Sequence, residues 1–290
     1  MMNFIFRRLA VDYVRRPINR LNLVYPYYMQ GQMFEEQQRR WRAFPSDVLN
    51  RLRFIIVDDG SPEKPALDFL LDGDTPLKIE IYKIDVDKPW NQDGAQNLGA
   101  LFCINEWIFL SDMDRFLPLE SIRKIFALRA SRSEYFKFNG LLAESGWRDL
   151  SELKPTTPHK NSYLIHWDLY WKVGGRDEYF SGLYSMCWIF RHRLKKMGRQ
   201  RMLDAYVVEY SNKVVRDSNT KARRTDRKER RRLRNALKSD RKFWKRLPED
   251  SLLFPWHKEY PQGSISGGRG LGRESLTDLN DQINSARELR

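Results

Sequence analysis

The sequence contains little cysteine and no long apolar run. Cys103 and Cys187 are its only cysteines in 290 residues, and both fall in predicted helices, so a disulfide framework is excluded. No stretch of about 18 uncharged apolar residues occurs, and the apolar run at the N-terminus is too short for a signal peptide. These absences predict a protein without a transmembrane segment, in a reducing, cytoplasmic setting.

Acidic residues are also scarce, with 38 Asp and Glu against 52 Lys and Arg and a net charge of +14. The excess is concentrated in residues 221–246, which hold 14 basic and 3 acidic residues. Good helix formers with few apolar positions predict a solvated basic helix there, which would attract a polyanion, either nucleic acid or an anionic membrane surface. The plain alternative is a basic face in solvent. The polyanion-binding candidates are Arg227, Lys228, Arg230, Arg231, Arg232 and Arg234.

Apolar residues are plentiful, at 41% hydrophobic and 13% aromatic, which is ample for one packed domain. Short apolar runs alternate with helical patterns through the first 130 residues. This alternation predicts an α/β fold with a mainly parallel sheet and helices on both of its faces. The predicted strands of this region are 21–25, 54–58, 78–84 and 107–110.

The second half is less regular. Strands are predicted at 134–138, 163–167 and 203–210, and a helical apolar stripe from Leu183 to Met197 ends before Gly198. The glycine run at 268–272 follows no predicted strand, which excludes a dinucleotide-binding fingerprint. We expect an N-terminal basic segment (1–19), an α/β domain (20–212), a basic helical extension (213–262) and a glycine-rich linker with a polar tail (263–290).

Two predicted strands run directly into a pair of acids. Asp58 and Asp59 follow one strand, and Asp112 and Asp114 follow another. Because ligands of open α/β sheets bind beyond the carboxyl ends of the strands, we expect both pairs on one rim. Asp114 could instead cap the helix that begins near Pro118, and the Asp59-Gly60 pair could form a hairpin turn, although the prolines that follow favour a loop.

Five motifs occur in the order and approximate spacing of family 2 glycosyltransferases, which have the GT-A fold, and the similarity covers residues 20 to 200. The resemblance implies transfer of a sugar from a nucleotide diphosphate donor, here expected to be a UDP-sugar, to an acceptor hydroxyl, with a bound Mn²⁺ or Mg²⁺. The motifs are Tyr25-Pro26-Tyr27-Tyr28, Val57-Asp58-Asp59-Gly60-Ser61, Ala95-Gln96-Asn97-Leu98-Gly99, Phe109-Leu110-Ser111-Asp112-Met113-Asp114 and Gly174-Gly175-Arg176-Asp177-Glu178-Tyr179-Phe180.

The resemblance also assigns site residues. It implies that Asp112 and Asp114 bind the metal, with Asp114 as the direct ligand. His257 would be a third ligand, as a C-terminal histidine is in some GT-A enzymes. Two like charges 4 Å apart repel by roughly 1 to 4 kcal/mol, so a divalent cation would remove the conflict between the acids and a diphosphate. The implied donor-binding residues are Pro26, Tyr27, Tyr28, Asp58, Asp59, Asn97 and Asp112.

The acceptor side departs from the family pattern. An inverting member uses the aspartate of a Glu-Asp pair as general base, where this chain has Met186 and Cys187. Asp177 and Glu178 are the nearest substitutes, and capping or ion pairing explains them equally well. A retaining mechanism and a loss of activity both stay open.

These observations predict a metal-dependent glycosyltransferase that acts on a polyanionic acceptor, such as DNA with a hydroxyl on a modified base. One alternative is transfer to a lipid-linked or surface glycan, with the basic helix in peripheral contact with membrane headgroups. The other is an inactive nucleic-acid-binding protein that keeps the GT-A scaffold.

Overall fold

A computed structural model describes most of the α/β part of the chain. No helix among the residues that the model describes is both long and apolar enough to cross a membrane. Both cysteines are free, as the sequence predicts. Most of the predicted basic extension and tail lie outside the described ranges. These ranges are 14–72, 77–88, 90–144, 147–182, 187–218, 231–232, 235–236, 252–261 and 266–267.

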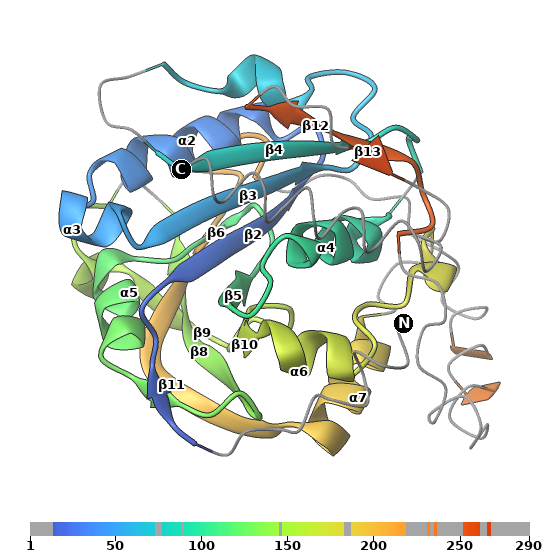
Figure 1. Ribbon diagram of the computed structural model, residues 1–290. Coiled ribbons are helices and arrows are strands. Elements are labelled where there is room, and N and C mark those ends of the chain that lie inside the picture. The colour runs from blue at the N-terminus through green and yellow to red at the C-terminus, as the bar shows by residue number, and fades with distance from the viewer. Residues whose placement is uncertain are drawn as a thin grey trace.

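The described residues form a mixed α/β fold around an 11-stranded sheet (Figure 1). The strand order is β13-β12-β4-β3-β2-β5-β10-β8-β11-β6, and β9 pairs with β8. The strands of this sheet are β2 (Leu21–Tyr27), β3 (Leu52–Asp58), β4 (Ile79–Ile84), β5 (Trp107–Leu110), β6 (Arg115–Phe116), β8 (Glu134–Ala143), β9 (Lys154–Thr156), β10 (Tyr163–His166), β11 (Arg199–Tyr210), β12 (Trp256–Tyr260) and β13 (Ser266–Gly267).

The centre of the sheet is parallel. Strands β4, β3, β2 and β5 pair in parallel, in keeping with the predicted βα alternation. Strands β10 and β12 add to the two sides of this group in antiparallel orientation. Strand β12 covers the outer side of β4.

Helices and short 3-10 turns connect the strands. A separate two-stranded sheet joins β1 (Arg16–Pro17) to β7 (Arg129–Ala130). The helices and turns are α2 (Gly31–Arg42), α3 (Ser46–Leu49), α4 (Gln92–Leu101), α5 (Leu119–Phe126), α6 (Trp167–Lys172), α7 (Trp188–Met197), η1 (Ala66–Phe69), η2 (Leu150–Glu152) and η3 (Glu178–Phe180).

Both faces of the central strands are buried. Alternate residues of β2 belong to two different apolar clusters: Tyr25 packs with Trp41 of α2, and Val24 packs with Leu98 of α4. The α2 cluster also includes α5, and the α4 cluster includes α6 and α7. Gly99 brings α4 close to β2, since a Cβ there would overlap the Val24 side chain. The predicted two-layered helix covering is therefore confirmed.

Several predicted details differ from the structure. The region between the predicted strands 134–138 and 163–167 contains η2 and a further strand, β9. Met197, predicted on a buried stripe, is 39% exposed at the last turn of α7. Pro118 is the N-cap of α5 rather than a residue of its first turn. These are end effects, where sequence periodicity gives the least information.

Candidate active site

The two acid pairs lie at the same edge of the sheet. Strand β2 separates β3 from β5, and all three strands are parallel, so Asp58 and Asp112 follow strands that end on one rim. Two strand spacings amount to roughly 10 Å, which is a span suited to a nucleotide and its phosphates. The rim that the sequence predicts is confirmed.

Asp58 and Asp59 hold the loop that follows β3. The Asp58 carboxylate is fully buried and accepts hydrogen bonds from the backbone N–H groups of Ser61 and Ala66, both at 2.8 Å. Asp59 accepts from Asn91 Nδ2 at 2.9 Å and from the Asn91 backbone N–H, and burial raises its pKa well above the usual value. Gly60, at φ +71°, opens this loop toward a 3-10 turn, so the hairpin alternative is wrong.

The tyrosine segment at the end of β2 divides into a core part and a rim part. Pro26 and Tyr27 are buried, and the Tyr27 hydroxyl donates to the carbonyl of Lys64 at 2.5 Å. Tyr28 is partly exposed and donates to Asp87 at 3.1 Å. Of the three predicted donor-binding residues, Tyr28 has the most accessible ring.

Asn97 serves the fold. Its side-chain oxygen accepts from Tyr170 Oη at 2.6 Å and from the backbone N–H of Arg176 at 2.8 Å. Its Nδ2 donates to Glu178 at 2.6 Å and to the carbonyl of Arg176 at 2.9 Å. Because the side chain is fully buried and these bonds use both ends of its amide, the predicted donor contact is not compatible with this position.

Asp112 belongs to a hydrogen-bonded group of side chains. One carboxylate oxygen accepts from Gln92 of α4, and the other lies 3.3 Å from His159 Nε2. The other ring nitrogen of His159 bonds Ser162 Oγ at 2.7 Å. Burial alone would raise the pKa of Asp112, but His159, Arg115 and further cations outweigh it and hold the pKa below its usual value.

Asp114 is buried with little compensation. Its nearest cation is Arg115, whose Nε lies 3.7 Å from Oδ1 and whose Nη1 pairs with Glu209 at 2.6 Å. Burial, reinforced by Asp112, raises the pKa of Asp114 to about 7. Gln37 of α2 fixes the loop by donating to the carbonyls of Met113 and Arg115, each at 2.9 Å. The capping alternative is wrong, because α5 has no side-chain cap.

The predicted metal ligand His257 lies elsewhere. It sits on β12, where Nδ1 is 2.6 Å from Asp85 Oδ1. Four strand spacings, roughly 19 Å, separate β12 from β5, so His257 cannot share an ion with Asp112 and Asp114. Within the described ranges, no three side chains of His, Cys, Asp or Glu gather closely enough to hold a metal by themselves.

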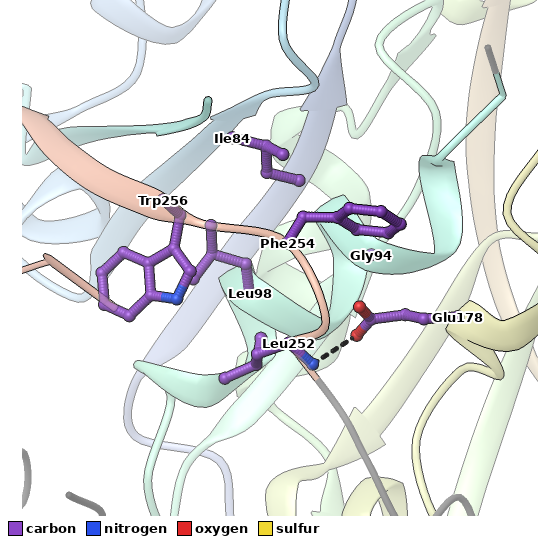
Figure 2. A pocket seen from close by; sticks show the side chains of 7 residues that line it. All are labelled: Ile84, Gly94, Leu98, Glu178, Leu252, Phe254 and Trp256. Carbon is purple, nitrogen blue, oxygen red and sulfur yellow. Dashed lines mark hydrogen bonds between the residues drawn. The ribbon is translucent and has the colours of Figure 1, made fainter. Parts of the chain in front are cut away.

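Glu178 is a structural residue. Its carboxylate accepts from Asn97 and from the backbone N–H groups of Leu252 at 2.8 Å and Leu253 at 2.9 Å. Figure 2 shows the Glu178 side chain pointing toward Leu252 beside a small apolar pocket between α4 and β12. These hydrogen bonds engage both carboxylate oxygens in holding the fold, so the prediction that Glu178 acts as base is wrong. Asp177 pairs with Arg193 at 3.2 Å and stays a candidate.

The pocket of Figure 2 is too small for a nucleotide sugar. Its empty volume is about 160 Å³, whereas ligand pockets usually measure ~300 Å³ or more. It therefore reports how the C-terminal segment packs on α4 rather than where a substrate binds.

Four residues near Asp112 were not predicted as site residues from the sequence: Lys137, His159, Asp93 and Arg176. Lys137 of β8 donates to the carbonyls of His159, Lys160 and Ser162, and so holds the His159 loop. Asp93 and Arg176 face each other at 3.5 Å. No spacing in the sequence links these positions, which are brought together only by the pairing of β5, β10 and β8. Asp93 alone had a signal, as an acid in the first turn of a helix that begins at the rim.

Of the predicted polyanion-binding residues, Arg231 and Arg232 are helical and exposed. Arg227, Lys228, Arg230 and Arg234 lie outside the described residues. Their role stays a prediction.

Solved structures resemble this chain in fold. The crystal structure of S. aureus TarS 1–349 has a TM-score of 0.51 at 15% identity and covers 67% of this chain and 61% of its own. The structure of GalNAc-T7 with UDP, GalNAc and Mn²⁺ has a TM-score of 0.50 at 10% identity, covering 67% and 44%. The fold is that of GT-A glycosyltransferases. No protein-family model and no curated protein matches the sequence.

The likeness to these glycosyltransferases covers 67% of this chain. The matched region spans less than two thirds of either structure, and 15% identity or less carries the fold alone. The GT-A fold that the motif order predicts is thus confirmed, and the chemistry must be argued from the side chains.

Proposed function

We propose that this chain is a glycosyltransferase that moves a sugar from a nucleoside diphosphate, of the UDP type, to an acceptor hydroxyl. The observation that carries the proposal is the placement of Asp59 and Asp114 at the ends of two parallel strands flanking β2 in a GT-A fold. A TarS structure with UDP has the same fold, with a TM-score of 0.50 at 13% identity.

Asp59 is our candidate for the nucleobase contact. Both oxygens of Asp58 are bonded to backbone N–H groups of their own loop. The Asp59 carboxylate accepts from the side chain and the backbone N–H of Asn91 and closes no hydrogen bond within its own loop, so a base N–H is a further donor that it could accept. Tyr28, directly after the neighbouring strand β2, offers a partly exposed ring within electrostatic range of Asp59. This pairing of a ring and an acceptor suits a pyrimidine.

The residues of the acid loop fit a divalent cation. Asp114 carries hard oxygen ligands, and burial without an adequate counter-charge raises its pKa to about 7, which is the state that a cation would relieve. Mg²⁺-type ions commonly take one or two carboxylates and fill their remaining positions with phosphate and water, so a third protein ligand is not required. Asp114 and Asp112 would hold Mn²⁺ or Mg²⁺, which as a Lewis acid would stabilise the departing diphosphate.

In the proposed transfer, the acceptor oxygen bonds to the anomeric carbon as the bond to the diphosphate breaks, and the hydroxyl proton passes to a base. Asp177 is the remaining acid of the glycine motif for this task, since Glu178 is committed to the C-terminal segment. Asp177 is within electrostatic range of Asp93, which lies near Asp112. The stereochemical course stays open.

A thermal-shift panel tests the proposal. Ligands that bind only the folded state raise its stability, by about 2.7 kcal/mol at a hundredfold excess over Kd. We expect UDP and UDP-sugars to raise the melting temperature, and Mn²⁺ to increase that shift in wild type but not in Asp114→Asn. GDP and ADP serve as matched nucleotide controls. No shift with any nucleotide diphosphate would contradict the proposal.

We further propose that the acceptor is a polyanion, with DNA as the specific case. Described residues on both sides of the basic segment contact the α/β domain. Asp217, just before it, accepts from the N–H groups of Gln32 and Met33 at 2.8 Å at the start of α2, directly after the Tyr28 rim. Leu252, just after it, bonds Glu178 beside α4. These two anchors support a role for the segment in guiding the acceptor.

A DNA-binding assay tests this second proposal. Replacing Arg230, Arg231, Arg232 and Arg234 by glutamine should remove most of the affinity and about four from the slope of log affinity against log salt. The matched control replaces four exposed arginines elsewhere, namely Arg20, Arg123, Arg148 and Arg199. Binding that is absent or insensitive to salt contradicts the DNA proposal, and sedimentation with anionic but not neutral vesicles would favour a lipid-linked acceptor.

A further inference from the structure

Arg176 is a buried guanidinium with one unpaired edge. It is 1% exposed, and its Nε and Nη2 have no hydrogen-bond partner among the described residues. Its third nitrogen, Nη1, lies 3.5 Å from Asp93 Oδ1. Buried polar groups are nearly always bonded, and leaving a charged one unpaired is costly, so this edge calls for an explanation.

In Arg53, the same two guanidinium nitrogens, Nε and Nη2, both have partners. Its Nε and Nη2 donate to the two carboxylate oxygens of Glu80, each at 2.7 Å. Its Nη1 donates to the carbonyl of Phe102 at 2.6 Å. This two-point geometry is the strong form of arginine recognition and matches a planar carboxylate. Arg176 presents the corresponding two nitrogens with nothing bound to them.

The backbone holds Arg176 in place in advance. Gly175, at φ +62°, turns the chain, and Asn97 bonds both the N–H and the carbonyl of Arg176. The guanidinium carbon lies 4.6 Å from the centre of the Phe190 ring. A side chain fixed in this way loses little entropy when it binds a partner.

The surroundings of Arg176 carry further unpaired donors and positive charge. The Tyr163 hydroxyl is buried without a partner among the described residues, and its ring centre lies 6.0 Å from the guanidinium carbon. Gln96 lies one turn beyond Asp93 on α4, and both ends of its amide are unpaired there. Arg176 and Arg191 together act on Lys137, lowering the pKa that burial already depresses.

Arg176 also lies close to the candidate active site, because its ion-pair partner Asp93 is next to Gln92 on α4, and Gln92 donates to Asp112. On the proposed function, the diphosphate would lie at Asp112 and Asp114. The anionic group that pairs with Arg176 would then belong to the sugar. We propose that the Nε–Nη2 edge of Arg176 binds a carboxylate on the donor sugar, so that the donor is a UDP-uronic acid. This inference rests on the proposed function.

Calorimetric titration with UDP, UDP-glucose and UDP-glucuronate in the presence of Mn²⁺ tests the inference. Wild type should bind UDP-glucuronate at least tenfold more tightly than UDP-glucose. Arg176→Lys, which keeps the charge and removes the fork, and Arg176→Gln should lose that preference while still binding UDP. Tyr163→Phe, which removes a hydroxyl without a described partner, should reduce the preference by a smaller factor and provides a variant that should fold if the arginine variants do not.

The outcomes separate the two levels of the argument. If wild type binds UDP but shows no preference for UDP-glucuronate, the inference is overturned and the proposed function stands. If wild type binds no UDP, the proposed function fails and the inference falls with it. Inorganic phosphate serves as a further probe: if it stabilises wild type but not Arg176→Gln while the uronate preference is absent, the edge binds phosphate and the carboxylate assignment is wrong.

Discussion

The two acid pairs of the rim have the same sequence setting and different physical states. Asp58 has both oxygens on backbone N–H groups of the loop that it closes, at 2.8 Å each. Asp114 has Arg115 at 3.7 Å and a pKa raised to about 7. Asp58 thus contributes to the fold, whereas the Asp114 carboxyl is buried beside a cation that only partly offsets its desolvation.

The arginines repeat this contrast. Arg53 is saturated by Glu80 and Phe102 in the half of the sheet around β3 and β4. Arg176, in the half around β5 and β10, keeps two nitrogens unpaired. The same kind of side chain is thus satisfied in one half of the sheet and unsatisfied in the other.

The largest expected difference between the acid pairs is in activity. Asp114→Asn should lower Mn²⁺-dependent hydrolysis of UDP-sugars by ~10²–10³-fold, because a metal-stabilised leaving group is worth several kcal/mol. Its stability should stay equal or increase, since the amide removes a charge that burial opposes. Hydrolysis assays and urea denaturation measure the two effects, with the exposed acid variant Asp204→Asn as control. Activity within fivefold of wild type would count against the assignment.

The second expected effect is on stability. Asp58→Ala should lower the free energy of unfolding by about 2–4 kcal/mol, because it leaves the buried N–H groups of Ser61 and Ala66 without an acceptor. Urea denaturation measures this loss. Asp59→Ala, which loses the bonds to Asn91 alone, is the matched comparison and should cost less. An equal cost for the two variants would remove the distinction drawn between Asp58 and Asp59.

The smallest expected effect is a pH dependence of the free energy of unfolding, caused by Asp93. Burial raises the pKa of Asp93 to about 6, with Asp177 and Asp112 adding to the shift and Arg176 opposing it. A carboxyl group with a raised pKa favours folding while it is protonated, so this contribution is lost as pH rises from about 4 to 6. Relative to wild type, Asp93→Asn should therefore gain roughly 1–3 kcal/mol of stability over that interval. Denaturant titrations at pH 4, 5, 6 and 7 measure the difference, and a constant difference would contradict the shift.

Sequence periodicity predicted the central strands well. The runs that contain Leu23, Phe54, Ile81 and Phe109 all form strands of the sheet, because a strand buried on both faces must be continuously apolar. The helix predicted from residue 93 to 103 is α4, from 92 to 101. Local physics decides these elements, so a single sequence is sufficient.

The site was predicted less completely. The acids could be predicted because they end strands. His159, on the loop before β10, and Lys137, on β8, reach Asp112 only because β10 inserts in antiparallel orientation between β5 and β8. His257 was assigned by analogy with a C-terminal histidine. Strand β12 pairs with β4, so β4, β3 and β2 separate His257 from the acids that follow β5. Contacts of this kind depend on strand order, which hydrophobic periodicity does not encode.

The sequence by itself determined the alternating strands and helices, the two acid pairs at strand ends and the segregation of positive charge into one segment, because each follows from residue order and side-chain chemistry over short distances. The tertiary structure alone decided which polar groups are satisfied. It closed the hydrogen bonds of Asp58, Asn97 and Glu178 and left two nitrogens of Arg176 without a partner among the described residues, since hydrogen-bond partners are brought together by packing between elements far apart in the chain.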